Sequence, residues 1–292
     1  MSAALSLERV LASLTGPQRV QEDGACAAWT APTLDLEGGG VFGGELLGQA
    51  VMIASQLDAT MPVHSVSAAF PRGVRDTGTL EFTATTLHRG SAYSTQRIEV
   101  VQPDRHGTAA VAFTATVVCH RPAEGVEHDA SMPANAGSPD DARQVGMGII
   151  PWETRIVGAT DLDDRAAQPN ELMLWTRVPD GDLGDNLAVH QGLLAHLSDL
   201  TLIGTALLPH EGRSQLDAHA ALRTSVITHQ VVFHRPFRID DWLLLHQSSP
   251  AASGGSAFGV GHVFSRDGQL VASVTQESMI RVAPESRDGG DA

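Results

Sequence analysis

Apolar and alternating stretches follow one another twice along the chain, in the same order. Residues 44–57 and 185–204 are apolar on nearly every side, which is typical of helices buried in a core. Each is followed by segments rich in Val, Thr and Phe that are separated by Gly- or Asp-rich turns, which predicts strands. This repeated order predicts two similar modules built around one core.

The pattern predicts the following elements. In the first module we expect a short amphipathic helix over 5–15, a strand over 24–32, the buried helix, and strands over 63–70, 79–87, 91–101 and 108–119. In the second module we expect strands near 154–157 and 171–177, the buried helix, and strands over 222–233, 241–248, 256–264 and 269–280.

The same pattern divides the chain into modules. We expect a first module over 1–120, a polar linker over 121–147, a second module over 148–283 that carries the site, and a tail over 284–292. Each module has the α+β composition of an antiparallel sheet wrapped around one helix. Placed side by side, the two units would form a continuous sheet with both helices packed against it.

A repeated signature marks the same point in each module. Phe70 and Arg72 precede a turn that begins at Asp104, and Phe233 and Arg235 precede a turn at Asp267 with the same spacing. The functional site is therefore expected where the two copies differ.

Composition removes several classes of function. The net charge of −15 argues against nucleic-acid or anionic-membrane binding, which need a positive surface. All 19 basic residues are arginine, so mechanisms that depend on a phosphate-binding or Schiff-base lysine are excluded. The lysine-free, Ala- and Gly-rich composition is typical of a GC-rich bacterial genome. Without a signal-peptide pattern or a long apolar span, we expect a cytoplasmic protein with no membrane insertion.

Other chemistries lack their motifs. The 13 histidines show no metal-binding spacing, and the serines near 248–253 do not form a GxSxG elbow. Cys26 and Cys119 imply no disulfide framework, and Cys119 reads as a packed strand residue. The glycines of 38–44 lack the order of a dinucleotide-binding loop.

Several motifs together resemble the acyl-CoA thioesterase II family. In the second half these are Phe233-His234-Arg235-Pro236-Phe237, Asp241-Trp242-Leu243-Leu244, the run from Ser249 to Gly255, Asp267-Gly268, Val271-Ala272-Ser273 and Gln276-Glu277. In the first half they are Gly43-Gly44, Gln49-Ala50 and Val63-His64-Ser65 leading to Phe70 and Arg72. The resemblance covers nearly the whole chain except the linker and the tails. It implies a double hot-dog fold.

The resemblance also implies a reaction, the hydrolysis of acyl-CoA to a free acid and CoA. In that family a carboxylate, a glutamine and a Ser or Thr hydroxyl position the attacking water. The carboxylate corresponds to Asp199 and the glutamine to Gln276, whereas the hydroxyl position falls on Val226, which cannot orient water. Strand alternation places Thr228 on the same face as Val226, so Thr228 is the candidate substitute.

The remaining implications concern the substrate and partners. Gly44, Arg72, Arg235, Gly254 and Gly255 are the candidate substrate-binding residues, and both arginines could instead be structural, because they repeat in each module. No metal or other cofactor is implied. The expected partner is acyl-CoA, in lipid metabolism, and the flat faces and edges of hot-dog sheets would allow homo-oligomers.

The residues themselves support two of these positions. Asp199 lies in a mostly apolar helix, where an unpaired carboxylate is costly. Gln276 alternates in phase with Ala272 and Val274, so its amide is expected to face the interior and to need a partner there. The alternative is that an inward Asp and Gln simply satisfy each other or local backbone groups.

Two functional hypotheses follow. The first is an acyl-CoA thioesterase in which Asp199 and Gln276 position the water. The second is a non-catalytic acyl-CoA- or lipid-binding protein whose site has degenerated at Val226. Acyl chain length, the physiological substrate and the oligomeric state are not encoded in any motif that we recognise.

Overall fold

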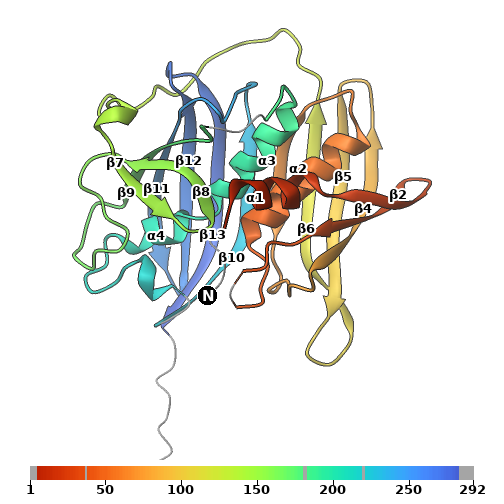
Figure 1. Cartoon of the computed structure of the whole chain (residues 1–292), viewed down its shortest axis with the longest axis horizontal. Helices are drawn as coiled ribbons and strands as arrows, with labels where there is room; N and C mark the ends of the chain where they lie inside the picture. The colour runs from red at the N-terminus through yellow and green to blue at the C-terminus, as the bar shows by residue number, and fades with distance from the viewer. Residues whose placement is uncertain (1–4, 37, 180–182, 219–220, 283–292) are drawn as a thin grey trace, which may run out of the picture.

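The strands form one continuous antiparallel sheet in the computed structural model, which describes residues 5–36, 38–179, 183–218 and 221–282. The strand order is β1-β2-β4-β5-β6-β3-β10-β13-β12-β11-β9-β8-β7. The helices lie against one side of this curved sheet (Figure 1). The predicted tail over 284–292 lies outside the described residues.

The bounds of the elements are as follows. The helices are α1 (Leu7–Thr15), α2 (Gly43–Leu57), α3 (Leu187–Ser198) and α4 (Leu202–Leu207), with short 3-10 turns at Pro139–Asp141 and Gln215–Asp217. The strands of the first half are β1 (Gln18–Asp23), β2 (Cys26–Pro32), β3 (Val63–Ala69), β4 (Thr79–Arg89), β5 (Tyr93–Pro103) and β6 (Ala109–His120). Those of the second half are β7 (Arg143–Met147), β8 (Ile150–Ile156), β9 (Glu171–Arg177), β10 (Leu222–Phe233), β11 (Leu243–Ser253), β12 (Ser256–Ser265) and β13 (Leu270–Val282).

The two halves meet at the pair β3–β10 in the middle of the sheet. On one side the order is β2-β4-β5-β6-β3, and on the other it is β9-β11-β12-β13-β10, so the strands of the two modules repeat in mirrored order. A single cluster of buried side chains runs through both modules. The predicted α+β architecture, a double hot dog with one shared core, is confirmed.

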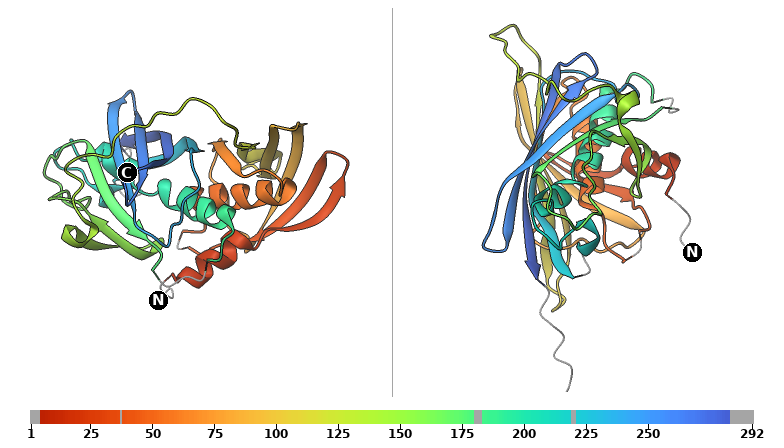
Figure 2. Two further views of the ribbon diagram at one scale, coloured as in Figure 1. Left: turned by 90° about the horizontal axis from the view of Figure 1, so that it is seen from above. Right: turned by 90° about the vertical axis from the view of Figure 1, so that its left-hand side faces the viewer.

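The long helices α2 and α3 lie side by side at the centre of the molecule (Figure 2). Glycines allow this close approach. A Cβ atom on Gly44 would lie 2.1 Å from the carbonyl oxygen of His196, and one on Gly48 would lie 2.9 Å from that of Gly192. The N-terminus of α2 therefore meets the C-terminal end of α3, next to Asp199.

The predicted helix over 185–204 is interrupted, which corrects one expectation. It begins after Asn186, whose side chain accepts a hydrogen bond from the N–H of Ala188 at 3.1 Å. It ends at Ser198 with Asp199 as its C-cap, and α4 begins again at Leu202. Ser and Asp side chains compete with the backbone for hydrogen bonds, which favours such a break. Asp199 is thus at a helix end and not in a helix interior.

Strand β10 contains a β-bulge that the alternation of its sequence did not reveal. Its register against β13 shifts between Val226 and Thr228, and the extra residue, Ile227, is 42% exposed. A bulge adds one residue to one strand and so reverses the direction of every side chain beyond it. Val226 and His229 therefore face the interior, whereas Thr228 does not.

The predicted linker is more structured than expected at its C-terminal end. Residues 143–147 form β7, which pairs with β8 at the edge of the sheet, so the second module begins earlier than residue 148. Before β7, the linker lies on the outer face of the second half, where Trp175 donates from Nε1 to the carbonyl of Ala136 at 3.2 Å.

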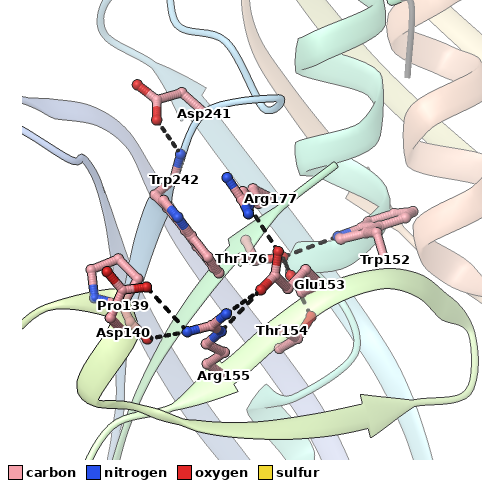
Figure 3. A network of polar contacts seen from close by, with 10 residues as sticks. All are labelled: Pro139, Asp140, Trp152, Glu153, Thr154, Arg155, Thr176, Arg177, Asp241 and Trp242. Atoms are coloured by element: carbon pink, nitrogen blue, oxygen red, sulfur yellow. Dashed lines mark hydrogen bonds and ion pairs between the residues drawn. The ribbon is translucent and has the colours of Figure 1, made fainter. Parts of the chain in front are cut away.

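A network of charged and aromatic side chains holds this edge (Figure 3). Arg155 and Arg177 both bond to Glu153, and their guanidinium carbons lie 5.1 and 4.6 Å from the ring centroid of Trp242. Arg155 also donates to the carbonyl of Pro139 at 2.9 Å, which joins the linker to the sheet.

Among the described helices, none is both long enough and apolar enough to cross a membrane.

Candidate active site

The carboxyl group of Asp199 lies where the end of α3 meets the start of α2. The N–H of Gly44 donates to this carboxylate, and a Cβ atom on Gly43 would lie only 2.6 Å from Oδ2. The side chain is 2% exposed, and Oδ1 has no hydrogen-bond partner within the described part of the chain. One buried oxygen atom therefore remains free to accept a proton or a hydrogen bond.

Burial controls the protonation of this group. Loss of hydration raises the pKa of Asp199 from 3.8 to about 7, although the hydrogen bond from Gly44 opposes the rise. The N-terminus of α2 also carries partial positive charge, which favours the carboxylate. Desolvation is the larger effect, and it places the pKa near neutrality, which suits a general base.

His229 connects Asp199 to the neighbouring strand. Its Nδ1 lies 3.6 Å from Asp199 Oδ1 and 2.8 Å from Gln276 Oε1, and its Nε2 lies 2.9 Å from Ser198 Oγ. Burial lowers the pKa of His229 to about 4, so the ring is neutral at neutral pH. The contact with Asp199 is therefore between a carboxyl group and a neutral imidazole, and not an ion pair.

Gln276 lies on the interior face of β13, as its alternation predicts, and is 1% exposed. Its Oε1 accepts from His229, and its Nε2 donates to Ser278 Oγ at 2.9 Å. The prediction that this amide needs an interior partner is confirmed, and the partners are a histidine and a serine. Asp199 and Gln276 approach the same ring nitrogen, so the fold brings both predicted residues into one cluster.

Thr228 lies outside this cluster, so the prediction that it shares the face of Val226 is wrong. Its hydroxyl donates to Glu277 Oε2 at 2.7 Å on the outer face of the sheet. The bulge at Ile227 is the reason, since it reverses the alternation between Val226 and Thr228. Thr228 cannot replace the missing hydroxyl.

Arg72 is bound to backbone and does not face the cluster. Its guanidinium donates to the carbonyl groups of Gln102, Pro103, Ala110 and Val111, where β5 turns into β6. Arg235 donates to Leu270 O at 3.1 Å and to Asp129 at 2.7 Å in the same place of the second module. These contacts favour the structural alternative for both arginines.

Gly254 and Gly255 form the turn between β11 and β12. Their φ angles of 62° and 81° lie in the left-handed region, which explains why glycine stands at both positions. The carbonyl of Gly255 accepts from the N–H of Ile280 on β13. Ile280 is four residues beyond Gln276, which corresponds to about 13 Å along an extended strand. Neither glycine touches the cluster around Asp199.

Three members of the cluster were missed in the sequence, namely Ser198, His229 and Ser278. Ser198 directly precedes Asp199, and Ser278 alternates in phase with Gln276, so both could have been predicted to lie near the site. His229 gave conflicting signals, because alternation from Val226 places it on the opposite face, whereas alternation from Val231 and Phe233 places it on the interior face. The bulge explains how Val226 and His229 both face inward.

The chain is similar to acyl-CoA thioesterases in two independent comparisons of sequence. The profile described as "Acyl-CoA thioesterase" matches residues 168–279, and "Acyl-CoA thioesterase N-terminal domain" matches residues 31–120. Acyl-CoA thioesterase 2 of Haemophilus influenzae is 30% identical over 82% of this chain and 87% of its own length. Acyl-coenzyme A thioesterase 8 of Mus musculus is 27% identical over 84% of this chain and 81% of its own length.

Solved structures give the same result. The acyl-CoA thioesterase II TesB2 of Mycobacterium marinum superposes with a TM-score of 0.75 at 30% identity, covering 94% of this chain and 98% of that one. The tesB protein of Mycobacterium avium subsp. paratuberculosis gives 0.77 at 26% identity, covering 96% of this chain and 100% of that one.

Proposed function

We propose catalytic roles for Asp199 and Gln276 on the premise that the chain, which belongs to the acyl-CoA thioesterase II family, is a thioester hydrolase. The observation that supports these roles best is the free buried oxygen of Asp199 beside the amide of Gln276. A carboxylate in this setting can accept a proton from water, and an amide can hold the water or the thioester carbonyl by hydrogen bonding.

The reaction requires two proton transfers, one from water to Asp199 and one from Asp199 to the leaving sulfur. Asp199 Oδ1 accepts a proton from water while the water oxygen forms a bond to the thioester carbonyl carbon. As the tetrahedral intermediate collapses, the C–S bond breaks, and the thiolate of CoA leaves with the electron pair. The proton held by Asp199 then passes to the sulfur, which regenerates the carboxylate and releases free acid and CoA.

We place the acyl chain in a hollow of about 710 Å³ between α1 and the β7–β8 hairpin, which Arg9, Asp35 and Gln144 also line. Its apolar walls include Leu5, Leu36, Val145, Met147, Ile150 and Trp152. The ring of Trp152 lies 6.0 Å from that of His196 on α3, and the carbonyl of His196 faces Gly44. Trp152, which lines the hollow, thus links it to the helix that ends at Asp199.

The test of this function is CoA release from a panel of short, medium and long acyl-CoAs. Turnover of at least one chain length supports the proposed roles, and the preferred length reports the depth of the acyl site. The alternative, a non-catalytic acyl-CoA- or lipid-binding protein, rests on Val226 alone. Saturable acyl-CoA binding without CoA release across the panel would establish that alternative.

The rate is expected to depend on pH through Asp199. Its pKa is raised to about 7, so the ionised form that can accept a proton increases as pH rises through neutrality. We expect kcat/KM to rise about tenfold per pH unit below pH 7 and to level off above about pH 8. Steady-state kinetics between pH 5 and 9 measure this profile.

Glu45 offers a matched control for the pH profile. It too is buried, and burial raises its pKa to about 7, but its Oε1 accepts from Ser13 and from the N–H of Leu34, both in the first module and outside the cluster around Asp199. The variant Glu45→Gln should therefore keep the inflection near pH 7. If the inflection moves with Glu45→Gln, the titrating group is not Asp199.

A further inference from the structure

We propose that Ser278 supplies the hydroxyl that the position of Val226 lacks, so that the hydroxyl has moved from β10 to the adjacent strand β13. This inference rests on the proposed roles of Asp199 and Gln276. It assigns Ser278 to the water that attacks the thioester, a role that Thr228 cannot fill from the outer face.

The register of the sheet places Ser278 next to the empty position. Ser278 and Val226 are direct partners in the β10–β13 ladder, and both face the interior. Directly opposed Cβ atoms in an antiparallel pair lie about 5 Å apart. A hydroxyl on Ser278 can therefore reach the same volume as one attached to residue 226, and it approaches that volume from the other strand.

The hydrogen bonds around Ser278 have a direction. Gln276 Oε1 can only accept, so His229 donates to it from Nδ1, and Nε2 of the neutral ring carries no proton. The one hydroxyl proton of Ser198 serves either this nitrogen or the carbonyl of Ala195, both 2.9 Å from Oγ. Gln276 is thereby oriented with its nitrogen toward Ser278, and Nε2 donates to Ser278 Oγ at 2.9 Å. Ser278 is the acceptor at the end of this chain, so its own proton must be donated elsewhere.

No acceptor for that proton is found within the described part of the chain. The two cross-strand neighbours of Ser278 are Val226 on β10 and Ala257 on β12, and neither side chain can accept a hydrogen bond. Ser278 is only 3% exposed, so bulk water does not replace them. A hydroxyl that is oriented, buried and left with a free proton is suited to hold a bound water molecule.

Asp199 and Ser278 would then fix this water from two sides. Asp199 Oδ1 is free to accept one of its protons, and the Ser278 hydroxyl donates to its oxygen. Ser198 and His229 act as positioning residues, because they set the orientation of the Gln276 amide that donates to Ser278.

The first test is Ser278→Ala, assayed by CoA release. We expect kcat/KM to fall about 10- to 100-fold, which is the usual effect of removing one hydrogen bond that acts in the transition state. The matched control is Ser273→Ala, because Ser273 lies on the outer face of the same strand and bonds to His234 and His262. Its rate should change less than about twofold, and thermal unfolding should show that both variants are folded.

A second variant separates a role in the reaction from a role in packing. Val226→Thr, made in the Ser278→Ala background, returns a hydroxyl to the same volume from the opposite strand. We expect at least about a tenfold recovery of kcat/KM there, against less than about a threefold gain when Val226→Thr is made alone. Repair of packing would not produce this dependence on the hydroxyl at position 278.

The outcomes distinguish the two proposals. If the wild type turns over, Asp199→Asn abolishes turnover and Ser278→Ala leaves it unchanged, the proposed function stands and the role of Ser278 is overturned. A large gain from Val226→Thr alone would also overturn it, since the hydroxyl would then be missing and not relocated. A wild type without any turnover removes both proposals.

Discussion

Replacing Asp199 with asparagine is expected to lower kcat/KM for acyl-CoA hydrolysis by about 10²- to 10⁴-fold, the range associated with loss of a general base. Asparagine keeps the shape of the side chain but cannot accept a proton from water. The effect should appear mainly in kcat, because the carboxylate acts on the water and not on substrate binding. CoA release under single-turnover and steady-state conditions measures both parameters.

The same variant should remain folded, and stability provides the control. In the unfolded chain Asp199 titrates near its ordinary pKa of 3.8, whereas in the folded protein the pKa is about 7. The folded state therefore holds a proton that the unfolded state releases, and stability falls as pH rises from about 4 to 7. This cost, at most about 4 kcal/mol, is absent in the variant.

We therefore expect Asp199→Asn to be at least as stable as the wild type at pH 8. Chemical unfolding at pH 5 and pH 8 measures this difference, which should be larger at pH 8. An inactive variant that is also strongly destabilised at pH 8 would mean that Asp199 supports the structure of the α2–α3 junction. Full activity in the variant would remove Asp199 from the mechanism.

Replacing Gly44 with alanine is expected to destabilise the protein by about 3 kcal/mol or more. The added Cβ would lie 2.1 Å from the carbonyl oxygen of His196 and 2.5 Å from the ring of Phe42. The carbonyl belongs to the backbone of a buried helix, so it cannot move without separating α2 from α3. This steric cost exceeds the gain of at most about 1 kcal/mol that alanine brings over glycine within a helix.

A second glycine at the same helix contact serves as the control. A Cβ atom on Gly192 would meet its nearest neighbour, the carbonyl oxygen of Gly48, at 3.5 Å, which is an ordinary contact. Gly192→Ala should therefore be neutral or stabilising by up to about 1 kcal/mol. Denaturant unfolding gives the free energy of unfolding of both variants. Equal changes in the two variants would show that helix propensity, and not the close approach of the helices, decides the outcome.

Most of the fold could be predicted from the pattern of the chain. The two buried helices, the strands of both modules and their assembly into one sheet follow from apolar runs and alternation, which are local features. The expected bounds differ from the observed ones by a few residues for most elements, and β10 was predicted to the residue. The larger misses are β1, β7 and the break in the second helix at Asp199, where the local pattern was polar or too uniform.

The candidate site was only partly predictable. Asp199 and Gln276 were identified from the family resemblance and from the cost of burying polar groups. Thr228 was misplaced because alternation assumes a regular strand, and Ile227 forms a bulge. For Arg72 a substrate-binding and a structural role both stayed open, because a sequence does not show which carbonyl groups surround a guanidinium.

By itself, the sequence determined the two-module architecture, the family and two of the polar residues that face the interior, Asp199 and Gln276. Hydrophobic periodicity is a property of consecutive residues, so it can be seen before the chain folds. The tertiary structure alone decided that the N–H of Gly44 meets Asp199, that His229 turns inward, and that Ser278 lies opposite Val226. These relations join segments far apart in the chain, and they depend on the close approach of two helices and on one extra residue in a strand.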